Sequence, residues 1–111
     1  MIVDHAIKDA RGVSYLFRRR HPADELPRTP GIVALILYAD YGLSIVHIEA
    51  TDDLSSLDGQ IADRISEFQH HHFSGKIGVA TLLTPHKNRK DRNRLAAELS
   101  SFNVEEIKAA S

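Results

Sequence analysis

Residues 30–54 read PGIVALILYADYGLSIVHIEATDDL and contain two hydrophobic runs. The first covers residues 32–38, the second covers residues 43–50, and a short polar segment at residues 39–42 separates them. Aliphatic runs of this length, bounded by Pro, Gly and Asp, are typical of the two strands of a β-hairpin. The residues that follow, TDD at 51–53, favour the start of a helix. We therefore expect a hairpin that leads directly into a helix.

The apolar side chains after the hairpin return every three or four residues, which is the spacing of one face of an α-helix. They are Leu54, Leu57, Ile61, Ile65 and Phe68. Residues 76–84 (KIGVATLLT) have the length and composition of a third strand. Thr84 and Pro85 suit the N-cap and first position of a second helix, in which Leu95 and Leu99 are expected to face inward.

The predicted fold is α+β, with a small three-stranded sheet, mixed or antiparallel, flanked by helices in the order β-β-α-β-α. A short final helical turn is expected at residues 104–107. The 111 residues are enough for one hydrophobic core without disulfides or metals. Residues 1–29 carry weak patterns and end in a segment with several prolines, which disfavours helix. We expect them to form a lead-in that packs on the edge of a domain made by residues 30–111.

The composition favours a cytoplasmic protein. The chain has no cysteine, which removes disulfides and cysteine-ligated zinc. No apolar stretch approaches the roughly 18 residues of a transmembrane helix. The first residues, MIVDHAIKDARG, lack the basic segment of a signal peptide. A membrane partner is therefore not expected.

The charges are segregated although the net charge is only −1. One basic cluster is formed at residues 18–20, flanked by Arg11 and Arg28, and a second at residues 86–94. Such clusters can contact nucleic acid, and the second has no interleaved aromatic residues, so it favours phosphate contact over base stacking. The predicted nucleic-acid-binding residues are Arg18, Arg19, Arg20, Lys87, Arg89, Lys90, Arg92 and Arg94. The alternatives are a solvated helix face or pairing with the acidic segment between the clusters, which could also serve a basic protein partner or another copy of the chain.

Two short motifs in the hairpin resemble those of the GIY-YIG nuclease superfamily. Gly31-Ile32-Val33 stands where the family has Gly-Ile-Tyr, and residues 47–51 (HIEAT) stand where it has Tyr-Ile-Gly-x-Thr. Leu54 matches the leucine that opens the family's helix. The resemblance extends over residues 30–103 and implies the scaffold of that family.

The resemblance also implies that the usual chemistry is impaired. Val33 lacks the hydroxyl of the first family tyrosine, and His47 replaces the second. Leu57 stands near the position of the family's helix arginine and cannot neutralise phosphate charge, while Arg64 lies two turns later. Glu98 matches the family's single metal ligand. If the protein is active, the resemblance implies His47, Arg64 and Glu98 as catalytic residues, with Glu98 binding Mg²⁺ or Mn²⁺; no other cofactor is indicated.

His47 and Glu49 alternate with apolar residues, so they are expected to share one face of the second strand with Ile45 and Thr51. An imidazole on such a face can act as an acid or base near neutral pH. The leading hypothesis is a non-catalytic or weakly active GIY-YIG-like domain that acts as a nucleic-acid-binding or interaction module. One alternative is a divergent metal-dependent endonuclease or phosphodiesterase. The other is a small protein-interaction or dimerisation regulator that does not bind nucleic acid.

Overall fold

The computed structural model describes residues 5–9, 11–21, 23–39, 42–70, 76–99 and 104–106. Its strands are β1 (His5–Lys8), β2 (Ser14–Arg20), β3 (Gly31–Ala39), β4 (Gly42–Thr51), β5 (Lys76–Leu83) and β6 (Val104–Glu106). Its helices are the 3₁₀-helix η1 (Leu54–Leu57) and the α-helices α1 (Ile61–Gln69) and α2 (Arg89–Leu99). No helix in this described part of the chain is long and apolar enough to cross a membrane.

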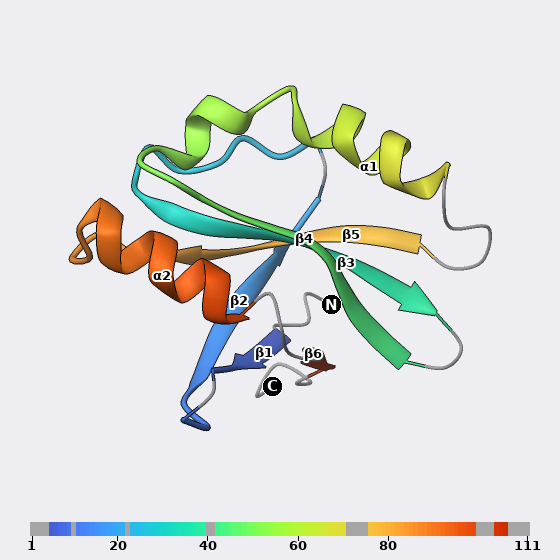
Figure 1. Ribbon diagram of the computed structural model, residues 1–111. Helices are drawn as coiled ribbons and strands as arrows, with labels where there is room; N and C mark the ends of the chain where they lie inside the picture. The colour runs from blue at the N-terminus through green and yellow to red at the C-terminus, as the bar shows by residue number, and fades with distance from the viewer. Residues whose placement is uncertain are drawn as a thin grey trace.

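The strands form one curled sheet in the order β4-β3-β5-β2-β1-β6, and all of its pairings are antiparallel (Figure 1). The predicted β3–β4 hairpin is confirmed. The predicted three-stranded sheet with the order β-β-α-β-α is wrong, because three further strands complete the sheet. One of them, β2, lies between β5 and β1, so residues expected to form a lead-in supply an interior strand.

The additional strands carry too few apolar residues for a clear sequence signal. In β2 only Phe17 is buried, and three arginines end the strand. β1 has four residues and β6 has three. These strands depend on their sheet partners, since short isolated strands are not stable in water. The helical turn expected at residues 104–107 is replaced by β6, which pairs with β1.

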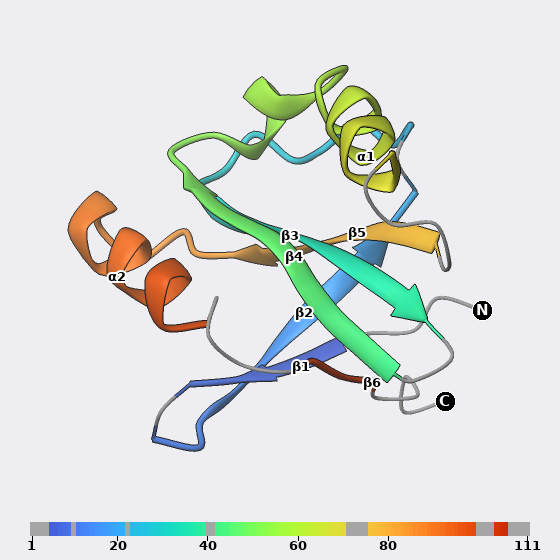
Figure 2. The same ribbon diagram turned by 45° about the vertical axis from the view of Figure 1, so that its right-hand side comes forward.

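Both faces of β3 are buried, which explains its uninterrupted apolar run. Ile32, Ala34 and Ile36 face the core that contains Phe17 and α2 residues, including Leu95 and Leu99. The other face of β3 packs against η1 and α1; its buried residues are Val33, Leu35 and Leu37. Each such aliphatic side chain contributes roughly 1.5–3 kcal/mol when fully buried. Figures 1 and 2 show the result, with η1 and α1 on one side of the sheet and α2 on the other.

A β-bulge changes which side chains of β4 share a face. Leu35 pairs with His47, whereas the next residue of β3, Ile36, pairs with Ile45, so Val46 is the extra residue. Ile45 therefore packs on the α2 side, while His47 lies on the α1 side. The predicted common face of Ile45 and His47 is wrong for this reason.

The apolar repeat at residues 54–68 forms two helices instead of one. Asp53 accepts a hydrogen bond from the Ser55 amide at 3.0 Å and caps η1. Gly59 then adopts a φ of 81°, a left-handed conformation that interrupts the helix before α1 begins. The second helix also starts later than expected, at Arg89, and Asn88 Oδ1 accepts from the Asp91 amide at 2.8 Å.

Candidate functional site

The α1 side of β4 carries a polar cluster of His47, Glu49 and Arg64. His47 and Glu49 are two residues apart on the strand, so both point toward α1, where Arg64 lies. His47 Nε2 is 3.0 Å from Glu49 Oε2, and Arg64 Nη1 donates to the same carboxylate oxygen. The His47 ring lies beside Phe68, with 5.6 Å between ring centroids. The structure thus brings together two of the three predicted catalytic residues, His47 and Arg64, and adds Glu49.

The His47 imidazole is held in its neutral form at neutral pH. Partial burial lowers the pKa of His47 below its ordinary value of 6.5, and the positive charge of Arg64 lowers it further. The Glu49 carboxylate that His47 contacts is itself ion-paired with Arg64. A neutral imidazole can accept a proton.

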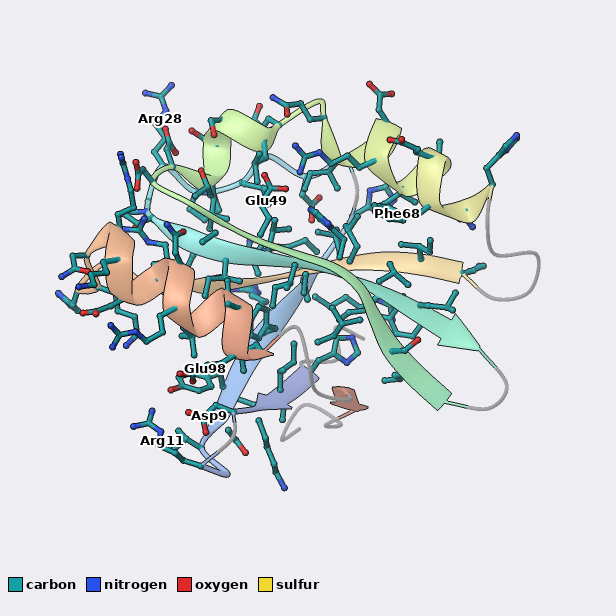
Figure 3. The ribbon with its side chains drawn as sticks, in the orientation of Figure 1. Asp9, Arg11, Arg28, Glu49, Phe68 and Glu98 are labelled. Atoms are coloured by element: carbon teal, nitrogen blue, oxygen red, sulfur yellow. The ribbon has the colours of Figure 1, made fainter. Side chains whose placement is uncertain are left out.

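The third predicted catalytic residue, Glu98, does not join this cluster. It lies on α2, whereas Glu49 and Phe68 lie on the opposite side of the sheet (Figure 3). Within the described residues no group of three or more His, Cys, Asp or Glu side chains could hold a metal ion. A metal ion at Glu98 and a base at His47 therefore do not face a common substrate position.

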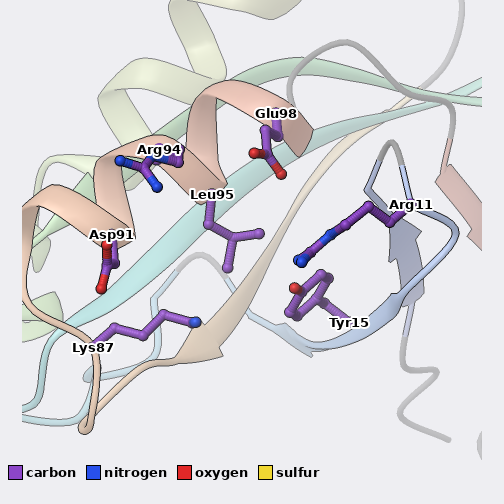
Figure 4. Close-up of a pocket in the computed structure, with 7 residues that line it drawn as sticks. All are labelled: Arg11, Tyr15, Lys87, Asp91, Arg94, Leu95 and Glu98. Carbon is purple, nitrogen blue, oxygen red and sulfur yellow. The ribbon is translucent and has the colours of Figure 1, made fainter.

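Glu98 instead lines a groove between α2 and the turn that joins β1 to β2 (Figure 4). The groove has a volume of about 280 Å³. Its lining residues come from two segments far apart in the sequence and are Arg11, Tyr15, Lys87, Asp91, Arg94, Leu95 and Glu98. It therefore combines three cations, two carboxylates, an aromatic ring and an apolar side chain.

Asp9 organises the turn that carries Arg11. Its Oδ1 accepts from the amides of Arg11 at 2.9 Å and Val13 at 3.0 Å, and Arg11 Nη2 is 3.0 Å from its Oδ2. Burial alone would raise the pKa of Asp9, but the Val13 amide and the Arg11 contacts outweigh it and lower the pKa below 3.8. Gly12 takes the left-handed conformation, with φ 83°, that the turn requires. Arg11 is thereby fixed at the mouth of the groove.

The basic cluster at residues 86–94 divides into one structural arginine and several exposed cations. Arg92 is only 4% exposed, and its Nη1 is 2.6 Å from Asp52 Oδ1. Arg89 pairs with Asp52 as well, but its side chain remains 75% exposed. Lys87, Lys90 and Arg94 are exposed, and no ion pair holds them within the described part of the chain. A second hollow, of about 290 Å³, lies around the Asp52 pairs.

The other predicted cluster, residues 18–20, does not line the groove. Arg19 lies over the Tyr38 ring at 4.7 Å, and Arg20 Nε donates to Thr81 Oγ1 at 3.0 Å. Arg18 is exposed on β2. The third cation of the groove, beside Lys87 and Arg94, is Arg11. In the sequence Arg11 only flanks the basic cluster at residues 18–20.

Tyr15 is the lining residue that the sequence reasoning missed. The signal that could have found it is the segment DARG at residues 9–12, since Asp and Gly at these positions are typical of a turn between two strands. A hairpin predicted there would have placed Tyr15 on the same face as Phe17.

In comparisons with known proteins, no family model, no curated protein and no solved structure matches the chain. The resemblance of the hairpin to GIY-YIG nucleases therefore stays a prediction.

Proposed function

We propose that the protein is a nucleic-acid-binding module that takes a single-stranded segment in the groove between α2 and the β1–β2 turn. The observation that carries the proposal is the convergence of Arg11, Lys87 and Arg94 on one groove that also contains Tyr15. Cations neutralise the phosphates of a nucleic acid, and an aromatic ring provides a surface on which a base can stack.

The size of the groove favours a single strand over a duplex. A hollow of about 280 Å³ accommodates a group of the size of one base with part of its backbone. Bases are available for insertion into such a hollow only where they are unpaired. The negative charges of Asp91 and Glu98 partly offset the three cations, so the groove is not expected to bind anions without selectivity.

The charges of the groove also define the expected salt dependence. A single strand releases about 0.7 counterions for each phosphate that is neutralised. Arg11 is already paired with Asp9, so Lys87 and Arg94 are expected to neutralise two phosphates, and the plot of log affinity against log salt concentration is expected to have a slope of about −1.4. A slope near zero would contradict phosphate binding at this site.

The test is fluorescence anisotropy with labelled single-stranded DNA and RNA of mixed sequence, titrated at 50 to 300 mM salt. Lys87→Gln and Arg94→Gln are each expected to weaken binding and to make the salt slope shallower by about 0.7. Arg28→Gln is the matched control, because Arg28 is exposed but lies on the other side of the sheet (Figure 3). Absence of binding at 50 mM salt, or an equal loss in all three variants, would contradict the proposal.

A second candidate function, self-association, is favoured by the position of β4. This strand has ten residues and lies at one end of the sheet order; among the described strands only β3 pairs with it, and β6 lies close to part of it. Such an edge can pair with another strand. Antiparallel pairing of two copies about Ile48 would place His47 of each opposite Glu49 of the other. Light scattering after gel filtration, from 5 to 500 µM protein, tests this function, and a constant monomeric mass would contradict it.

A further inference from the structure

We infer that the groove selects a guanine base, with Glu98 and Arg11 contacting the two polar edges of its ring. This inference rests on the proposed function, because it names the base that enters the same groove. It follows from the chemistry of two opposing walls, one on α2 and one on the β1–β2 turn.

The two side chains point into the groove from opposite sides. Figure 4 shows Glu98 descending from α2 and Arg11 reaching in from the turn, with the Arg11 guanidinium beside the Tyr15 ring and Leu95 next to Glu98 on α2. Glu98 is half-buried, and no hydrogen bond or ion pair holds its carboxylate within the described residues. A partly desolvated carboxylate in this position favours ligands that donate hydrogen bonds.

Arg11 keeps part of its donor capacity for a ligand. A guanidinium group has five N–H donors. Asp9 engages Arg11 through Nε at 3.3 Å and Nη2 at 3.0 Å, and the Tyr15 hydroxyl also interacts with the guanidinium. Nη1 and the second proton of Nη2 lie outside the two Asp9 contacts. These remaining donors are in the fork arrangement that binds two acceptors at once.

Among the common bases, guanine matches this pair of walls best. Its N1–H and N2 amino group lie side by side and can both donate to one carboxylate, as Glu98 offers. Its O6 and N7 atoms are adjacent acceptors, the pattern that an arginine fork binds in specific recognition of guanine. Adenine and cytosine present a single amino group beside a ring acceptor, and uracil and thymine present one N–H between two carbonyls. These patterns bring an acceptor lone pair against the Glu98 carboxylate.

The remaining lining residues fit the rest of one nucleotide. Tyr15 and Leu95 provide an aromatic and an apolar surface for the faces of the base. Lys87 and Arg94 lie at the other end of the groove and suit the phosphate, with Asp91 beside them (Figure 4). The volume of about 280 Å³ lies just below the roughly 300–1,000 Å³ of typical ligand pockets, which favours a site for no more than one nucleotide.

The experiment compares three labelled single-stranded DNA probes that differ at one central position. Each is a run of thymines with guanine, inosine or adenine in the centre, and inosine differs from guanine only by the missing N2 amino group. Wild-type protein is expected to bind the guanine probe about tenfold more tightly than the adenine probe. The inosine probe is expected to lose most of this advantage, because one donor to Glu98 is absent.

Two variants test whether Glu98 and Arg11 cause the preference for guanine. Glu98→Gln is expected to bring the guanine and inosine probes to similar affinity, whereas Glu67→Gln, an acid on α1 on the opposite side of the sheet, leaves the preference intact. Arg11→Lys keeps the charge but loses the fork, and it is expected to reduce the preference for guanine over adenine. Circular dichroism of each variant confirms the fold.

The outcomes separate the inference from the proposed function. If all probes bind with a salt-dependent affinity but none is preferred, the guanine site is refuted and the binding module stands. If guanine is preferred and Glu98→Gln does not change the preference, recognition lies elsewhere and the inference is wrong. If no probe binds at 50 mM salt, the proposed function fails, and the inference fails with it.

Discussion

Arg92 on α2 lies buried against Asp52 at the end of β4, with 2.6 Å between Nη1 and Oδ1. The same guanidinium donates from Nε to Thr84 Oγ1 at 3.2 Å and from Nη2 to the Lys87 carbonyl at 3.0 Å. One side chain thus ties together the end of β4, the exit of β5 and the segment that leads into α2. An arginine that the sequence groups with phosphate-binding cations instead positions the helix that carries the groove.

Replacement of Arg92 is therefore expected to destabilise the protein much more than replacement of its neighbour. Arg92→Gln removes three charge-assisted contacts from a buried position and is expected to lower the free energy of unfolding by about 2–4 kcal/mol. Arg89→Gln removes an ion pair to the same Asp52 carboxylate, but from an exposed side chain, and is expected to have little effect. Urea unfolding of both variants measures the difference. Similar losses would show that the Arg92 contacts do not determine stability.

His47 is expected to respond to a charge change on α1. Arg64→Gln removes a positive charge and releases Glu49, so both effects raise the pKa of His47. NMR titration of the His47 ring protons measures this pKa in the wild type and the variant. Arg94→Gln removes a cation from the opposite side of the sheet and is expected to leave the pKa of His47 unchanged. A pKa of His47 that is the same in wild type and Arg64→Gln would contradict the electrostatic coupling.

The sign of the pH effect on stability follows from the same shift. Because the pKa of His47 is lower in the folded protein than in the unfolded chain, the unfolded chain takes up this proton first as the pH falls below about 6.5. The contribution of His47 to stability is therefore complete above pH 6.5 and declines below it. The variant His47→Gln is expected to lose this part of the pH dependence between pH 5 and 7 in urea unfolding. If the unfolding free energy of His47→Gln changes with pH as that of the wild type does, other groups cause this pH dependence.

The β3–β4 hairpin and the two main helical segments are predictable from the sequence because their signals are local. β3 is apolar at nearly every position, and the helices repeat with the right spacing. β1, β2 and β6 are different, because pairing with distant strands determines them and their own residues carry little pattern. The groove is even harder to predict from the sequence, since it depends on the approach of the β1–β2 turn to α2. The bulge at Val46 and the turn at Gly59 shift side chains in ways that periodicity alone does not reveal.

Gly59 tests whether the break between η1 and α1 is required. A Cβ at this position would meet no atom within 4 Å, so the cost of Gly59→Ala arises from the backbone alone. An L-residue at φ 81° is strained by roughly 1–2 kcal/mol, and this is the expected loss of unfolding free energy. Gly59→Asn is expected to lose less, because asparagine tolerates the left-handed region. If alanine is tolerated without loss, a continuous helix is compatible with the packing of Leu57 and Ile61.

Asp9 links the stability of the β1–β2 turn to the groove, because its carboxylate holds both the turn amides and the Arg11 side chain. Asp9→Asn replaces the carboxylate with a neutral amide, so the two amide contacts and the Arg11 contact can no longer all be kept at full strength. The variant is expected to unfold at a lower temperature and to bind the guanine probe less tightly, because Arg11 loses its anchor.

The lowered pKa of Asp9 adds a pH signature to this test. The stabilisation from Asp9 is present above its unfolded value of 3.8 and is lost as the pH falls through its lower folded value, so the wild type and Asp9→Asn should converge in stability at strongly acidic pH. Asp24→Asn is the matched control, since Asp24 accepts from the His21 amide in an exposed turn and does not line the groove. If Asp9→Asn destabilises the turn but binds the guanine probe as the wild type does, Arg11 does not need this anchor to contact the base.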